Sequence, residues 1–172
     1  NALQTLGWGL VLSRLITYVV WHSGAPGVST PWAAVGGVLP CVQYLALVEI
    51  FHAFSGMVQA DGFTTAVQVA SRVSVVAATD ALASVHGSPA ILLFGLAWAI
   101  TEVVRYSWYA VKLVGTPYAA HTWLRYSTFL VLYPTGVCGE LMLYLAALPD
   151  LANIPALFSV TAATIVRRVI FP

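Results

Sequence analysis

Residues 90–114 read AILLFGLAWAITEVVRYSWYAVKLV, a long run in which apolar side chains predominate. Pro89 precedes the run and Gly115 and Pro117 follow it, and such residues are typical of loops. A helix needs about 20 apolar residues to cross the hydrocarbon core of a bilayer. This segment is therefore predicted to be a membrane-spanning helix, and that prediction decides the fold class.

Further apolar runs lie on both sides of this segment, separated by clusters of Gly, Pro, Ser and Asp. The predicted spans are about 3–21, 32–58, 64–84, 90–114 and 121–147. Pro40 either kinks the second span or marks its start. A sixth piece at about 155–166 is too short to cross. We thus expect one all-α domain over 1–172, a polytopic transmembrane helical bundle with five clear spans.

The composition supports the same class. Of the 172 residues, 60% are hydrophobic and 8% are charged, against about 25% charged residues in an ordinary soluble domain. So few charged side chains do not cover a water-soluble globule, which excludes a soluble enzyme. The net charge of +1, without a basic stripe, predicts no nucleic-acid partner.

The distribution of Lys and Arg predicts the orientation in the membrane. Lys112 and Arg125 flank the loop at about 115–120, whereas the loops at about 22–31 and 85–89 carry no Lys or Arg. Because cytoplasmic loops are enriched in these residues, we expect a cytoplasmic N-terminus.

Ionisable side chains within predicted spans are costly and usually mark functional sites. This chain carries Glu49, Arg72, Glu102, Arg105 and Glu140 in such positions. Glu102 and Arg105 are three residues apart on one predicted helix, so they can form an ion pair. The pair fits either a structural lock between helices or part of a binding site.

Arg72 and Arg105 also lie in the predicted cytoplasmic half of the bundle, near Lys112 and Arg125. Guanidinium groups bind phosphates well, which favours a phosphate-bearing cytosolic ligand for Arg72 and Arg105. The alternative is the positive-inside rule alone, which we prefer for Lys112.

Glu49 and His52 have the i, i+3 spacing of metal ligands in helical carboxylate bundles. Those bundles use two copies of the motif, and this chain has one. An ordinary buried polar pair is the better interpretation, and we expect no metal.

The last long span holds Tyr133 and Glu140, two helical turns apart and nearly on one face. Pro134 can kink this helix, and Gly136 and Gly139 permit close approach of a neighbour or a long ligand. A buried carboxyl group in an apolar span is a candidate acid–base catalyst. The alternative is a Glu bonded to a neighbouring helix and a Tyr that anchors the helix at the interface.

The stretch from Leu132 to Glu140, LYPTGVCGE, resembles the 3-hydroxyacyl-CoA dehydratase family, also called protein-tyrosine-phosphatase-like and, in plants, PASTICCINO. Further similarities run in order along residues 4–160, including 68–72 (QVASR) and 123–126 (WLRY). The Cys-x5-Arg loop of phosphatases is absent, because neither Cys41 nor Cys138 is followed by Arg six residues later.

The resemblance implies a six-span protein of the endoplasmic reticulum membrane. It implies the third step of very-long-chain fatty acid elongation, in which a (3R)-3-hydroxyacyl-CoA loses water to give the trans-2-enoyl-CoA. It implies no cofactor, and as partners the ketoacyl-CoA synthase, ketoacyl-CoA reductase and enoyl-CoA reductase of the same cycle. The catalytic residues of the family fall on Tyr133 and Glu140. We expect the substrate to contact Arg72, Arg105, Tyr106, Arg125 and Gly136.

The similarity departs from the family after Val160, where a polar loop and a sixth span are missing or replaced. We therefore expect a chain truncated near its C-terminus and atypical after residue 160. The alternative to an enzyme is a catalytically inactive membrane scaffold of the elongase assembly.

For the enzyme, we assign Glu140 as base and Tyr133 as proton donor, although the sequence leaves the direction open. Their α-carbons lie about 10.5 Å apart along a straight helix, so bending at Pro134 or a substrate lying along the helix must close that gap.

Overall fold

The computed structural model describes residues 2–21, 29–56 and 61–150. Within these ranges the chain is helical and contains no β-strand, which confirms the all-α prediction. The sixth apolar piece at 155–166 and the sequence after residue 160 lie outside the described residues. The helices are α1 (Ala2–Trp21), α2 (Pro31–Val35), α3 (Leu39–Leu45), α4 (Leu47–Phe54), α5 (Gly62–Ala81), the 3₁₀ helix η1 (Ala83–Val85), α6 (Ala90–Val114), α7 (Ala119–Ser127) and α8 (Phe129–Ala147).

The segment that decided the fold class forms one uninterrupted helix, α6, with the predicted bounds. The second predicted span is broken. Helix α2 ends at Val35 with Gly36 as its C-cap, and α3 begins at Leu39 with Pro40 in its first turn, where a missing N–H costs no helical bond. Pro40 therefore marks a helix start.

Three helical stretches are long and apolar enough to cross a membrane: Leu3–Trp21, Ala90–Val114 and Ala119–Ala147. The expectation of five clear spans was too high for the described residues. The apolar helix Leu39–Phe54 is shorter than a full span. Helix α5 has 20 residues, but its Ser, Thr, Gln, Arg and Asp side chains make it too polar to qualify.

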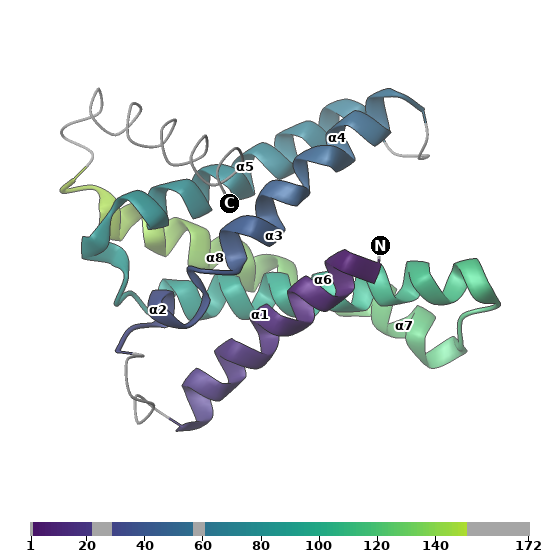
Figure 1. Cartoon of the computed structure of the whole chain (residues 1–172), viewed down its shortest axis with the longest axis horizontal. Helices are drawn as coiled ribbons and strands as arrows, with labels where there is room; N and C mark the ends of the chain where they lie inside the picture. Colours follow the sequence, from purple (N-terminus) through teal and green to yellow (C-terminus); the bar gives the residue numbers. More distant parts are fainter. Residues whose placement is uncertain (1, 22–28, 57–60, 151–172) are drawn as a thin grey trace.

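Helix α6 forms the centre of the bundle. It runs across the middle of Figure 1, and both α1 and α8 pack along it. Phe94 and Trp98 of α6 are buried together with Trp8 of α1 and Leu143 of α8. The outer faces of α1, α7 and α8 instead expose large apolar side chains, as lipid-facing helices do. Helices α3, α4 and α5 pack against one another, and side chains of α4 and α5 reach α6 at the polar site.

Candidate active site

Glu102 is the centre of a buried charge cluster. Its side chain is 1% exposed, on the face of α6 that meets α5. Arg72 of α5 pairs with Oε1 of Glu102, and Nε of Arg105 donates to Oε2 at 2.7 Å. The predicted pair of Glu102 and Arg105 is confirmed. Arg72 is a third member that helical spacing could not indicate, since it lies 30 residues away on another helix.

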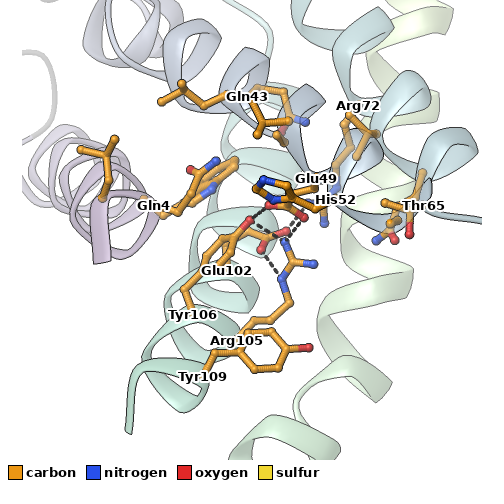
Figure 2. Close-up of a pocket in the computed structure, with 18 residues that line it drawn as sticks. Gln4, Gln43, Glu49, His52, Thr65, Arg72, Glu102, Arg105, Tyr106 and Tyr109 are labelled. Atoms are coloured by element: carbon orange, nitrogen blue, oxygen red, sulfur yellow. Dashed lines mark hydrogen bonds and ion pairs between the residues drawn. The ribbon is translucent and has the colours of Figure 1, made fainter. Parts of the chain in front are cut away.

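A second carboxylate completes the cluster from α4. Nη2 of Arg105 lies 3.3 Å from Oε2 of Glu49, and the hydroxyl of Tyr106 donates to Oε1 of the same carboxylate. Nη2 of Arg105 also donates to the Tyr106 oxygen at 2.8 Å. Figure 2 shows these side chains pointing toward one another. We call Glu49, Arg72, Glu102 and Arg105 the charge cluster; its two positive and two negative groups sum to zero.

The charge cluster forms the floor of a cavity of about 420 Å³. Side chains from α1, α3, α4, α5 and α6 line it, and the wall carries the neutral polar groups of Gln4, Gln43, His52 and Gln68. Gln43 is 1% exposed, and its Oε1 accepts no hydrogen bond from any residue that the structure describes. An acceptor buried without a partner is costly, so this wall suits a ligand that brings hydrogen-bond donors.

Arg72, Arg105 and Tyr106, three of the residues predicted to bind substrate, line this cavity. Arg125 does not, but its guanidinium lies 6.0 Å from the ring of Tyr109, which does. The carboxylates of the cluster already engage Arg72 and Arg105, so a phosphate would have to compete with Glu102 and Glu49 for them.

Glu140 of α8 is not among the residues that line the cavity, and it faces Trp98 of α6. The indole N–H of Trp98 donates to Oε1 of Glu140 at 3.0 Å. The guanidinium of Arg72 lies 5.1 Å from the centre of the Trp98 ring. A single side chain, Trp98, therefore separates Glu140 from the charge cluster.

Tyr133 takes a different direction from the same helix. It is 70% exposed, and its hydroxyl has no hydrogen bond to any of the described residues. The structure does not bring Tyr133 and Glu140 into contact. The two predicted catalytic groups share a helix, but Glu140 points toward α6 and Tyr133 points outward.

Comparison with known proteins identifies the family of this chain. The model of the family described as "Protein tyrosine phosphatase-like protein, PTPLA" matches residues 43–170, which contain the charge cluster, Trp98, Tyr133 and Glu140. The chain belongs to this family. The resemblance stated from the sequence is thereby confirmed.

Curated relatives of this PTPLA-family chain carry dehydratase names. It is 39% identical over 151 residues to a probable very-long-chain (3R)-3-hydroxyacyl-CoA dehydratase of Schizosaccharomyces pombe, covering 84% of this chain and 69% of that protein. It is 38% identical over 155 residues to the human very-long-chain (3R)-3-hydroxyacyl-CoA dehydratase 2, covering 87% of this chain and 58% of the human protein. A relative of the same name class in Caenorhabditis elegans is also 38% identical. The chain thus spans somewhat more than half of the human relative. No solved structure matches.

Trp98 and Gln43 are site residues of this PTPLA-family chain that sequence reasoning did not assign. Trp98 lies four residues before Glu102, so both share one face of α6, and that spacing is the signal that could have found it. Gly136 belongs to the same neighbourhood, because a Cβ added there would lie 3.6 Å from Cδ1 and Nε1 of Trp98. Gln43 had no comparable local signal.

Proposed function

We propose that this chain is a very-long-chain (3R)-3-hydroxyacyl-CoA dehydratase, a hydro-lyase of fatty acid elongation that forms the trans-2-enoyl-CoA and water. Its relatives are named for this activity. One observation in this chain carries the proposal: Glu140 is a half-buried carboxylate on a mostly apolar helix, held through one oxygen by an indole N–H. Such a group is suited to remove a proton from carbon in a site with little water.

The reaction needs a base for a proton on C2 and an acid for the hydroxyl on C3. Glu140 takes the C2 proton, and the electron pair of that C–H bond forms the double bond between C2 and C3. The C3–O bond breaks, and the leaving hydroxyl takes the phenolic proton of Tyr133 and departs as water. Proton transfer from the Glu140 carboxylic acid back to the Tyr133 phenolate restores both groups.

The two groups reach one substrate from two positions on α8. The Glu140 side chain leans back toward the helix N-terminus, as helical side chains do, and so shortens the distance to Tyr133. No described residue holds the Tyr133 hydroxyl in place, so its ring is free to turn toward a substrate that lies along α8. Pro134, within the helix, is the point at which bending would bring them closer.

The cavity on the charge cluster is proposed to receive the polar part of the substrate. Arg72, Arg105 and Tyr106 line it, and the unpaired Gln43 oxygen suits a donor such as an amide N–H or hydroxyl. Arg125, beside the cavity-lining Tyr109, is placed to meet a phosphate at the rim. Gly136 has no side chain, so it leaves space beside the Trp98 ring.

We further propose a multi-pass protein of the endoplasmic reticulum membrane with a cytoplasmic N-terminus. Apolar helices long enough to cross support a membrane location. The cavity is lined by the first turns of α1 and the second half of α6, and Arg125 lies 6.0 Å from the ring of Tyr109 in that lining. Under the positive-inside rule, this end of the bundle faces the cytoplasm. There the cavity would be accessible to acyl-CoA and to the other enzymes of the elongation cycle.

The test removes one group at a time. Tyr133→Phe keeps the ring and removes the hydroxyl, and Glu140→Gln keeps the shape and removes the ionisable proton. Losing a positioned acid or base costs about 10²–10⁴-fold, so each variant should slow formation of trans-2-enoyl-CoA at least 100-fold. The assay uses a long-chain (3R)-3-hydroxyacyl-CoA in membranes lacking other dehydratases.

Tyr118→Phe is the matched control, because this tyrosine is also largely exposed but lies before α7. It should keep the wild-type rate. Rates near wild type in either Tyr133→Phe or Glu140→Gln, at equal protein level, would remove that residue from the chemistry. Absence of product from the wild-type chain would instead favour an inactive membrane scaffold.

A further inference from the structure

The carboxylate of Glu140 is held at one oxygen only. Trp98 donates its indole N–H to Oε1 at 3.0 Å, and no other residue that the structure describes donates to Oε1 or Oε2. Trp98 itself is 2% exposed, so water does not compete for this N–H. Oε1 is therefore fixed, and Oε2 is left available to a substrate.

The Trp98 ring is fixed on several sides. The ring of Phe94 packs against it, with centroids 4.8 Å apart. The Arg72 guanidinium lies 5.1 Å from its centroid, and Arg72 is in turn held by the buried Glu102. On the side of α8, Gly136 leaves the ring edge room to approach the helix. The donor that meets Glu140 is thus itself immobilised.

We propose that Trp98 is a positioning residue, which holds the Glu140 carboxylate through Oε1 so that Oε2 points at the C2 proton of the substrate. The proposal rests on the dehydratase function proposed above. A free Glu side chain loses rotamer entropy when it is fixed, and the bond from Trp98 removes part of that freedom before substrate binds. Misplacing a reacting group by about 1 Å can cost about 100-fold in rate.

The competing interpretation is that Glu140 merely satisfies a buried indole N–H, which most buried Trp side chains require. The two interpretations differ in what loss of the N–H does. If the bond only stabilises the fold, its removal lowers the amount of folded protein. If Trp98 positions Glu140, removal of its N–H lowers kcat of the folded protein and leaves KM unchanged, since in this role Trp98 acts through Glu140 and not through substrate binding.

The experiment deletes the N–H and keeps an aromatic ring, as Trp98→Phe. We expect kcat to fall about 10- to 100-fold with KM within about twofold, measured per folded enzyme. Trp108→Phe is the matched control, because Trp108 is also a buried Trp of α6 and donates its N–H to Thr122 at 3.3 Å, away from Glu140. Its kcat should stay at the wild-type value.

A double mutant tests whether Trp98 acts through Glu140. In a Glu140→Gln background, Trp98→Phe should lower the residual rate no further, because residues that act as one unit are not additive. An equal further loss would overturn the proposal. A wild-type kcat in Trp98→Phe would also overturn it. If Glu140→Gln is inactive while Trp98→Phe has the wild-type kcat, the proposed dehydratase function stands and only the role of Trp98 is refuted.

A second variant keeps the proposal testable if Trp98→Phe does not fold. Biosynthetic replacement of Trp98 by 3-benzothienylalanine exchanges the N–H for sulfur and keeps the bicyclic shape. The same fall in kcat at unchanged KM supports positioning through the N–H. A wild-type kcat with this isosteric ring overturns it.

Discussion

Gly139 of α8 lies directly against the backbone of Phe94 in α6. A Cβ built on Gly139 would fall 2.6 Å from the Phe94 backbone nitrogen and 3.1 Å from the carbonyl oxygen of Ala90. Backbone atoms in a helix cannot move aside as a flexible side chain can. The contact between α6 and α8 therefore depends on the missing side chain at this position, as in other membrane helix pairs that meet at small residues.

We predict that Gly139→Ala forces α8 away from α6 and destabilises the protein by about 1–3 kcal/mol, the usual cost of overpacking. Gly136→Ala is the matched control on the same helix, because its Cβ would meet Ala97 and Trp98 at an ordinary 3.6 Å. Thermal unfolding in mild detergent compares the two variants. Equal midpoints for both would contradict the close contact at Gly139.

The two carboxylates of the charge cluster should differ in importance for stability. Glu102 is 1% exposed and forms ion pairs with both Arg72 and Arg105. Glu49 is 27% exposed and, among the described residues, forms an ion pair with Arg105 only. Removing one partner of a buried ion pair costs about 3–5 kcal/mol, so we predict a loss of this size for Glu102→Gln. Glu49→Gln should cost clearly less. Unfolding free energies measured by denaturant titration in micelles check the order, and the reverse order would show that the cluster is centred on Glu49.

The first turn of α5 should depend on pH through Asp61. The Thr64 backbone N–H donates to Oδ2 of Asp61 at 2.7 Å and caps the helix. Hydrogen bonding from Thr64 lowers the pKa of the Asp61 carboxyl below its ordinary value. The cap therefore contributes fully above the ordinary Asp pKa, and its contribution is lost as the pH falls through the lowered pKa.

Amide hydrogen exchange of the first turn of α5 measures this effect. We predict weaker protection at low pH than at neutral pH, after correction for the intrinsic exchange rate. Asp61→Asn keeps a capping oxygen that does not titrate, so its protection should be insensitive to pH. The same pH dependence in Asp61→Asn would exclude the carboxylate as its cause.

The orientation is tested at two described loops. A glycosylation acceptor inserted at Gly87, which is exposed with open space around it, should be modified in the lumen. An acceptor inserted between Gly115 and Tyr118, the loop flanked by Lys112 and Arg125, should remain unmodified. The opposite pattern would reverse the topology and place the cavity on the lumenal side.

Local sequence patterns predicted the parts of this molecule that depend on neighbouring residues. Helix α6 has the predicted bounds because Pro89 precedes it and Gly115 and Pro117 follow it, and Glu102 pairs with Arg105 because three residues are nearly one turn. For the second span, the sequence left open whether Pro40 kinks the helix or starts it, and the structure places Pro40 in the first turn of α3.

The site itself depends on contacts that no local pattern encodes. Arg72 meets Glu102 across 30 residues, Trp98 meets Glu140 across 42, and Arg105 meets Glu49 across 56. The composition of each span could show that a charge needed a partner, but not which of the available charges would be its partner. The spacing of Tyr133 and Glu140 likewise placed them near one face of α8, whereas the packing of α6 turns only Glu140 inward.

The charge cluster has a consequence for how the protein is made. Its four members come from three successive helices, with Glu49 on α4, Arg72 on α5, and Glu102 and Arg105 on α6. Arg72 is synthesised 30 residues before Glu102, and an unpaired Arg at the centre of a helix costs about 2.5–3.5 kcal/mol to insert. Insertion of α5 into lipid by itself is therefore unfavourable. We therefore expect α4, α5 and α6 to enter the bilayer together, as one set in which the charges of the cluster are paired.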